Sequence, residues 1–491
     1  MPERWARYIA GDPALLPLIP WDWREPPWEA ILRTRQSALI DRPTLVEALR
    51  RQNEVFLGDD PTLRSNIEAL LSLDTFVVTT GQQPGWLLGP LYTLVKAAHT
   101  IQLAEELNKR FQGQYRFVPL FWIAAEDHDA DEVRGIALGW GSRLEYRGHF
   151  QGPVGRHLIE AAFPPEAEDL ALQRYWKVGK RWDTAFRESM QALFQGTGLV
   201  WLSSDDPALK ATAIPLWVRE IQDKLTFHAH GLARQYLRAI GETASLHPRP
   251  INLFWLSDTE RRYPEPKEES ELLQAAYRFP QSLSPNVLLR PVFQEYILPN
   301  VAYVAGPGEV RYWLELLPIF QAFEVPMPVI YPRGHLRVLT APPPSLPRGL
   351  SWRDIWGLSQ NRLRTLLAEL WGESTLRAIQ EAWLAYRPPI EKLAEGSYMV
   401  RVERELQRLW RKGAERLRRA ALKELQNRFQ PHISEVLRYR EAIEPEGQLQ
   451  ERTLNIHAFS KKQPEEWLRN LMREIRFVSG EFSVYHAWSA S

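Results

Sequence analysis

Short apolar runs alternate with amphipathic stretches over the first two thirds of the chain. The β-branched run at residues 75–80 predicts a buried strand, and apolar residues then recur at helical spacing from Leu91 to about Leu107. A second apolar run at residues 117–125 predicts the next strand. Because strand, helix and strand follow one another closely, the pattern predicts a βαβ unit in a parallel, Rossmann-like sheet. Further strands are expected at 199–203, 251–256, 301–305 and 329–331.

Changes in this pattern predict four parts of the chain. Residues 1–73 form a helical segment that packs on the core, and residues 74–340 form the α/β core, with insertions at about 140–280. The proline-rich stretch at the start of 341–440 is typical of a linker. Residues 441–491 are expected to return to the core.

The third part, residues 341–440, has the pattern of a coiled coil. Apolar residues recur at intervals of three and four: Met399, Val402, Leu406, Leu409, and then Leu417, Ala421, Leu425 and Phe429. This spacing predicts a two-helix coiled coil or an antiparallel hairpin, and a dimer interface on it. Gly413 interrupts the register. Residues 401–428 carry 10 basic and 4 acidic side chains, for which a solvated helical face is the favoured interpretation and an RNA-binding arm the alternative.

Composition narrows the function. Among 491 residues there is no cysteine, which excludes disulfides, thiolate metal sites and a cysteine nucleophile. The formal net charge is only +1, whereas a general nucleic-acid binder carries a basic excess. The N-terminus has no secretory signal pattern and no run is long and apolar enough for a membrane helix, so a cytoplasmic protein is expected.

The first candidate for chemistry is the glycine-rich turn after the first predicted strand. Its glycines (Gly81, Gly85 and Gly89) would let backbone N–H groups approach a ligand, and the helix that follows favours an anion at its N-terminus. The amides of Gln82 and Gln83 suit a carboxylate or an amide, and Lys96 would add a positive charge. The spacing is neither a Walker A loop nor GxGxxG. A strand-to-helix turn without a ligand is the alternative.

The second candidate is the run Glu126, Asp127, His128 and Asp129, directly after the second predicted strand. Open α/β sheets bind ligands at the carboxyl ends of their strands. His128 is the expected general base for a substrate amine, oriented by Asp127 or Asp129. Two alternatives remain open: a site for a divalent metal, and a helix N-cap cluster with solvated acids.

The third candidate follows the predicted strand at 301–305. Glu309 and Tyr312 lie in the next helix and are expected to face the same crevice. For Glu309, helix capping is the alternative role. Upstream, Gln294 and Arg290 add polar groups, and Arg290 either clamps a substrate carboxylate or forms a structural ion pair. Arg333, after the strand at 329–331, is a weaker candidate of the same kind. We expect these loops to converge at one edge of a single parallel sheet.

Several blocks together resemble the bacillithiol-biosynthesis cysteine-adding family, also called cysteine ligases. They are GQQPGWLLGPLYTLVKA, FWIAAEDHDADEV, NLFWLSDTERR, SPNVLLRPVFQEYILPN, YVAGPGEVRYW and QERTLN, in this order along the chain. The resemblance implies a Rossmann-like core with connecting-peptide insertions, similar to class I aminoacyl-tRNA synthetases, and a C-terminal coiled coil that makes a homodimer. It also implies an amide-forming ligase that adds cysteine to glucosamine–malate, in the last step of bacillithiol synthesis.

The resemblance also carries expectations for ligands. The loop from Gly81 to Gly89 fills the place where a synthetase binds its nucleotide, and Arg452 and Asn455 would line a nucleotide pocket. ATP or ADP is the expected cofactor, with no metal other than Mg²⁺ accompanying it, and neither nucleic acid nor membrane is an expected partner. The sequence lacks the His-x-Gly-His motif and a clear Lys-Met-Ser-Lys-Ser loop of true synthetases. Two alternatives remain: a metal-assisted hydrolase at residues 126–129, and a synthetase-derived module that binds RNA or protein.

Overall fold

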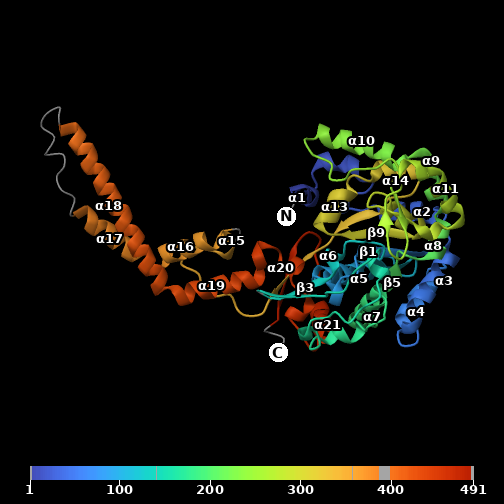
Figure 1. The fold of residues 1–491 in the computed structure, drawn as a ribbon, viewed down its shortest axis with the longest axis horizontal. Helices are drawn as coiled ribbons and strands as arrows, with labels where there is room; N and C mark the ends of the chain where they lie inside the picture. The colour runs from blue at the N-terminus through green and yellow to red at the C-terminus, as the bar shows by residue number, and fades with distance from the viewer. Residues whose placement is uncertain (1–2, 140, 356–357, 386–398, 488–491) are drawn as a thin grey trace. The chain divides into compact units, whose positions relative to one another are not determined.

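The computed structural model describes residues 3–139, 141–355, 358–385 and 399–487. The chain divides into two compact units. The first unit consists of residues 1–338 and 450–491, and the second consists of residues 339–449 (Figure 1). The second unit is therefore an insertion within the sequence of the first.

A five-stranded parallel sheet forms the centre of the first unit, in the order β10-β9-β1-β2-β5. The strands are β1 (Thr75–Gln82), β2 (Arg116–Ile123), β5 (Val200–Ser203), β9 (Asn300–Ala305) and β10 (Val329–Pro332). The chain builds outward from β1 through β2 to β5 and then returns to the other side of β1 with β9 and β10. This reversal makes a topological switch point beside β1, which is where open α/β sheets bind their ligands. The predicted Rossmann-like parallel sheet is confirmed.

Both faces of this sheet are covered, because successive side chains of a strand point to opposite sides. Val118, Leu120 and Trp122 of β2 join one apolar cluster, while Phe121 and Ile123 join another. The helices that cover the sheet include α5 (Tyr92–Arg110), α7 (Trp182–Phe194), α21 (Pro464–Glu474) and, near the N-terminus, α1 (Glu3–Ala10), α2 (Trp28–Gln36), α3 (Arg42–Asn53) and α4 (Pro61–Ala69).

Three small sheets lie outside the central sheet. One pairs β3 (Gly135–Gly139) with β4 (Ser142–Glu145), and another pairs β11 (His335–Leu339) with β12 (Phe482–His486). The strand predicted at 251–256 is β6 (Leu253–Leu256), which lies between β7 (Arg261–Arg262) and β8 (Leu283–Pro285) and not in the central sheet. The remaining helices of this unit are α6 (Ala130–Val133), α8 (Pro207–Thr212), α9 (Ile214–Asp223), α10 (Leu225–Ala239), α11 (Glu269–Arg278), α12 (Arg290–Ile297), α13 (Pro307–Trp313), α14 (Leu317–Phe323) and α20 (Gln450–Thr453).

The second unit is helical. It contains α15 (Trp352–Ile355), α16 (Gln360–Trp371), α17 (Glu373–Ala385), α18 (Met399–Arg428) and α19 (Gln430–Ile443). Helix α18 passes through Gly413 without a break, and a Cβ at Gly413 would lie 2.8 Å from the ring of Trp383. Glycine thus makes room for the stacking of Trp383 on Trp410, with ring centroids 4.4 Å apart.

The helices of the second unit pack as an antiparallel hairpin. Trp383 contacts Trp410, whereas Gly372 lies against Leu425, so the chain direction of α17 is opposite to that of α18. Leu425 is buried by these contacts, while Val402, Leu409 and Leu417 of the predicted stripe stay exposed. The side chain of Met399 lies outside those that the structure describes. In the described part of the chain, no helix has both the length and the apolarity needed to cross a membrane.

Candidate functional site

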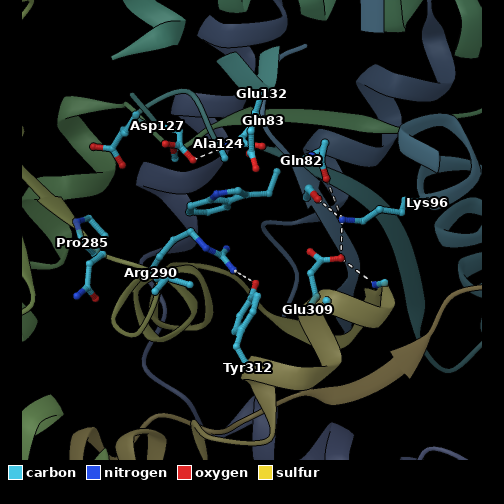
Figure 2. Close-up of a pocket in the computed structure, with 18 of the residues that line it drawn as sticks. Gln82, Gln83, Lys96, Ala124, Asp127, Glu132, Pro285, Arg290, Glu309 and Tyr312 are labelled. Atoms are coloured by element: carbon cyan, nitrogen blue, oxygen red, sulfur yellow. Dashed lines mark hydrogen bonds and ion pairs between the residues drawn. The ribbon is translucent and has the colours of Figure 1, made fainter. Parts of the chain in front are cut away.

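A cavity of about 620 Å³ lies at the carboxyl edge of the central sheet. Each of the five strands delivers residues to it: Gln82 and Gln83 at the end of β1, Ala124 after β2, Ser204 after β5, Gly306 after β9 and Arg333 after β10. Figure 2 shows Gln82, Asp127 and Glu309, which follow or end strands β1, β2 and β9, around a common space. The expected convergence of the three loops is therefore confirmed, because parallel strands place all their carboxyl ends at one edge.

The cavity separates the predicted site residues into two groups. Eleven line it: Gly81, Gln82, Gln83, Lys96, Glu126, Asp127, Arg290, Glu309, Tyr312, Arg333 and Arg452. Six do not: Gly85, Gly89, His128, Asp129, Gln294 and Asn455. The lining also contains residues that the sequence did not single out, including Tyr92, Trp122, Glu132, Phe254, Arg261, Tyr263, Asn286 and Tyr303. Most of these lie inside or next to the quoted blocks, so their position in those blocks was the available signal.

Lys96 ties the first loop to the third. Its side chain is 1% exposed, and the ammonium forms an ion pair with Glu309 at 2.7 Å. It also donates to the carbonyl oxygen of Gly81 and, at 3.5 Å, to Oε1 of Gln82 (Figure 2). Burial lowers the pKa of Lys96, and the Glu309 carboxylate opposes that effect. An ammonium has three N–H donors, and these three contacts use all of them. Lys96 therefore joins the first loop to the third and has no donor left for a ligand.

Glu309 has both of the roles considered for it. From the first turn of α13, its Oε2 accepts the N–H of Gly306 at 2.8 Å, which is a capping interaction. Its Oε1 accepts the hydroxyl of Tyr303 at 2.6 Å, and the same carboxylate lines the cavity. Burial, reinforced by this carboxylate, raises the pKa of Tyr303 well above its usual range, so Tyr303 stays a hydrogen-bond donor.

Arg290 points into the cavity without a carboxylate partner. Its guanidinium donates to Oε1 of Gln294 at 3.0 Å and to the hydroxyl of Tyr312 at 3.2 Å, and both partners are neutral. Among the described residues, no carboxylate forms an ion pair with it, which removes the structural ion pair considered for Arg290. A cation held by neutral groups at a cavity wall is suited to an anionic ligand, and guanidinium can bind a carboxylate with two parallel hydrogen bonds.

Glu126 lies at the end of a buried chain of charges. Its carboxylate is 2.5 Å from Nζ of Lys210, which is fully buried on α8 and also contacts Asp205 at 3.2 Å. Arg156 completes the chain by binding Asp205 at 2.6 Å. Burial raises the pKa of Glu126, and the Lys210 ammonium opposes that effect. Although burial acts the other way, Arg156 and Lys210 lower the pKa of Asp205 to about 2. Glu126 is thus a cavity carboxylate with a fixed cation behind it.

Asp127 and His128 face different surroundings. Oδ2 of Asp127 accepts the side-chain amide of Gln83 at 2.7 Å, inside the cavity. The His128 side chain is 52% exposed, and its Nδ1 lies 3.7 Å from Oδ1 of Asp127. Arg261 approaches the same Nδ1 at 3.2 Å, and because a guanidinium only donates, Nδ1 accepts. Arg261 thus engages Nδ1 of His128, and His128 lies outside the cavity lining, to which Glu126 and Asp127 both belong.

Asp129 caps the short helix α6. Its Oδ1 accepts the backbone N–H groups of Asp131 at 3.2 Å and Glu132 at 3.3 Å. This is the N-cap arrangement that the sequence left open for the acidic run. Within the described residues, no group of three or more metal-ligating side chains is arranged to hold a metal ion. The hydrolase alternative therefore has no metal site to rest on in the described chain.

The glycine-rich turn folds back on itself. Leu87 and Leu88 have φ values of 46° and 75°, and Gly89 follows at 65°. Non-glycine residues in this region cost about 1–3 kcal/mol each, so the surrounding contacts must hold the turn. A Cβ on Gly85 would lie 3.0 Å from Cα of Gly89, which explains the pair of glycines. Their role is close packing against each other, and neither lines the cavity.

Several backbone N–H groups of the same turn already have acceptors within the protein. The N–H of Gly85 donates to the carbonyl of Gln83 at 2.9 Å, and that of Gly89 donates to Trp86 at 2.8 Å. At the start of the helix, the N–H of Leu91 donates to the carbonyl of Leu454 at 2.8 Å. Phosphate sites at helix N-termini need such donors to be free. The N–H groups of Gly85, Gly89 and Leu91 are therefore not available to a nucleotide phosphate, and no step below depends on a nucleotide at this loop.

The C-terminal segment 450–455 returns to the cavity. Glu451 pairs with Arg333 at 2.7 Å and with His335 at 2.8 Å, and these partners outweigh burial and lower the pKa of Glu451 to about 2. Arg452 lines the cavity. Asn455 is 1% exposed and donates to the carbonyls of the glycine-rich turn, so its amide faces the protein and not a ligand.

Comparison with known proteins matches both units of the chain to one family. The model described as "Bacillithiol biosynthesis BshC, N-terminal Rossmann-like domain" matches residues 5–334, and the one described as "Bacillithiol biosynthesis BshC, C-terminal coiled-coil domain" matches residues 388–487. A protein of Chloroherpeton thalassium is 31% identical over 92% of this chain and 90% of its own length. Relatives from Salinibacter ruber and Symbiobacterium thermophilum are each 29% identical over 97% of this chain and over 94% and 96% of their own lengths. All three carry the name "Putative cysteine ligase BshC".

Proposed function

We propose that this chain, which belongs to the BshC family of bacillithiol biosynthesis, is a ligase that joins cysteine to glucosamine–malate through an amide bond. The observation that supports this proposal most is the charge arrangement of the cavity. Three arginines, Arg261, Arg290 and Arg452, line the cavity, and none of them forms an ion pair with a carboxylate among the described residues. Two carboxylates, Glu126 and Asp127, line the same cavity. Cysteine and a malate conjugate bring carboxylates and amines, which these two kinds of side chain complement.

The proposed chemistry needs one proton to be removed from the substrate amine before its nitrogen attacks the cysteine carboxyl carbon. Glu126 is suited to accept that proton, because it lines the cavity and its carboxylate is held by the Lys210 ammonium at 2.5 Å. Burial raises the pKa of Glu126, which favours proton uptake, and Lys210 opposes that effect. Arg290 is suited to hold a malate carboxylate. One oxygen of the cysteine carboxylate must leave as the C–N bond forms. It would leave on a phosphoryl or adenylyl group, for which ATP remains the predicted donor.

The test is a product assay with purified protein. Cysteine and glucosamine–malate are incubated with the chain, with and without ATP and Mg²⁺, and the conjugate is measured by mass spectrometry. We expect cysteine-dependent product, and at least a tenfold loss with Glu126→Gln. The matched control is Glu269→Gln. Glu269 lies outside the cavity lining, and its half-exposed carboxylate pairs with Lys224 at 3.2 Å. Absence of product from the wild type under every nucleotide condition would contradict the proposed function.

A second copy of the chain is the proposed occupant of the exposed stripe on α18. Val402, Leu409 and Leu417 are 46%, 61% and 40% exposed and recur at intervals of seven and eight residues, as in a helix-packing seam. We expect a dimer by analytical ultracentrifugation, and monomers when Leu409 and Leu417 are both replaced by Asp. A chain that sediments as a monomer before substitution would overturn this proposal.

A further inference from the structure

We propose that Asn455 is a positioning residue, which holds the glycine-rich turn in its strained form and thereby sets Gln82 and Gln83 in the cavity. The inference rests on the proposed function for its catalytic consequence. Asn455 comes 366 residues after Gly89, whose carbonyl it binds at 2.5 Å, and it binds the carbonyl of Leu87 at 2.9 Å. Both carbonyls belong to the left-handed stretch of the turn.

The amide of Asn455 is fully used, which fixes its orientation. Its Nδ2 supplies both N–H donors to the turn. Its Oδ1 accepts the backbone N–H of His457 at 3.0 Å and lies 2.8 Å from Nδ1 of the same ring. Burial lowers the pKa of His457 to about 4, so the ring is neutral, and Nδ1 carries the proton because Nε2 accepts from the N–H of Leu172 at 3.4 Å. A rotated amide would place N–H against N–H on one side and oxygen against oxygen on the other.

Asn455 is itself held in place by the backbone. Its N–H donates to the carbonyl of Ala137 at 2.9 Å, and the preceding residue, Leu454, forms a parallel bridge with Ala137. The carbonyl of Leu454 accepts the N–H of Leu91, at the end of the turn. The turn is thus fastened to a strand of another sheet and cannot relax its leucines without breaking these bonds.

The turn begins directly after two residues of the cavity wall. Gln83 donates to Asp127 at 2.7 Å and Gln82 donates to the hydroxyl of Tyr92 at 2.9 Å, so both amides have defined positions. Between them and the left-handed stretch lies Pro84, whose carbonyl accepts the indole N–H of Trp182 at 2.5 Å. If the turn relaxed, the bond from Trp182 and the stacking of Trp86 on Phe163, with ring centroids 5.7 Å apart, would still hold the chain that leaves Gln83. We infer that loss of Asn455 moves the glutamines more than it weakens the fold.

The experiment compares Asn455 with a second buried asparagine. Asn53 is also buried and also donates from Nδ2 to two backbone carbonyls, those of Leu49 at 2.8 Å and Trp201 at 2.9 Å, but it does not line the cavity. Asn53→Ala therefore removes the same kind of contact elsewhere. Asn455→Ala removes the amide, and Asn455→Asp keeps its shape while removing the donors to Leu87 and Gly89.

The first measurement is hydrogen–deuterium exchange of peptides covering residues 84–91 in the protein without substrates. We expect exchange at least tenfold faster in both Asn455 variants and no change in Asn53→Ala. Unchanged exchange in Asn455→Asp, or equal acceleration in Asn53→Ala, would overturn the proposal. If Asn455→Ala does not fold, Asn455→Asp and the control decide the question.

The second measurement is the product assay with cysteine and glucosamine–malate. We expect kcat/KM to fall at least tenfold in the Asn455 variants and to stay within twofold of the wild type in Asn53→Ala. Faster exchange with unchanged kcat/KM would refute a positioning role. A wild type that forms no product would reject the proposed function, and in that case the exchange comparison alone still decides whether Asn455 holds the turn.

Discussion

Removing the charge of Lys96 is expected to destabilise the first unit strongly, because the Glu309 carboxylate would keep its negative charge and lose its ion-pair partner. Lys96→Met leaves the Glu309 carboxylate without its ion pair at 2.7 Å, although Tyr303 and Gly306 still donate to it. Breaking a buried pair from one side costs about 3–5 kcal/mol. Glu309 keeps 20% exposure, so water compensates part of the loss and the lower end of that range, about 3 kcal/mol, applies.

The reverse substitution gives a second estimate of the same interaction. Glu309→Gln keeps an oxygen for Tyr303 but leaves a buried ammonium with only the Gly81 carbonyl and the Gln82 amide. Because burial already lowers the pKa of Lys96, this variant is expected to release the proton of Lys96 at a lower pH than the wild type does. The double variant removes both charges and should lose less than the two single variants combined, with a coupling energy of about 1–3 kcal/mol.

Urea unfolding followed by tryptophan fluorescence measures the free energy of unfolding for the four proteins of this cycle. Glu269→Gln is the control, since it breaks an ion pair whose side chains are 35% and 43% exposed, and it should change stability by no more than about 0.5 kcal/mol. Single variants that add within about 0.5 kcal/mol would refute the reasoning. Such a result would mean that Lys96 and Glu309 contact each other without a shared energetic role in joining the loops.

Three further outcomes can be checked on the same protein. Gly85→Ala should lower the free energy of unfolding by about 1–3 kcal/mol, because its Cβ would meet Gly89, whereas Gly308→Ala meets nothing within 4 Å and should be neutral in the same urea titration. Arg290→Met should raise KM for glucosamine–malate by about 10–100-fold, since charge-assisted hydrogen bonds contribute about 1.5–3 kcal/mol, and a KM within twofold of the wild type would remove Arg290 from the binding site. The pKa of Glu451 is lowered from 4.5 to about 2 in the folded protein. The ionised carboxylate therefore stabilises the fold fully above pH 4.5, and this contribution is lost as the pH falls toward 2. Between pH 5 and pH 3, the free energy of unfolding of the wild type should therefore fall by about 2 kcal/mol more than that of Glu451→Gln, and equal slopes would contradict the assignment.

The central strands could be predicted from sequence because burial on both faces leaves an unbroken apolar run. The predicted strands at 75–80 and 117–125 correspond to β1 and β2, which differ from them by at most two residues at each end. Their shared edge then follows from parallel pairing alone. The strand at 251–256 was also found, but its apolar pattern does not reveal its partners, and it pairs with β7 and β8 in a separate sheet.

Side chains whose roles come from long-range contacts could not be predicted in this way. Lys210 lies on a helix without a motif, and only the fold brings it within 2.5 Å of Glu126. Gly85 and Gly89 were interpreted as ligand-facing because glycine near a strand end has that use in many sites. A sequence does not distinguish that use from close packing of one glycine on another, which is what the structure contains.

The position of the second unit in the sequence follows from how the first unit is closed. Val338 and Gln450 flank the insertion, and they bind each other twice: the N–H of Val338 donates to Oε1 of Gln450 at 2.7 Å, and Nε2 of Gln450 donates back to the Val338 carbonyl at 2.9 Å. An insertion whose ends are joined in this way leaves the core contacts intact. Two residues that complete the site follow the helical unit in the chain. Arg452 lines the cavity, and Asn455 binds the glycine-rich turn, so both are synthesised only after the helical unit. The cavity is therefore assembled from both ends of the first unit, and neither segment alone contains it.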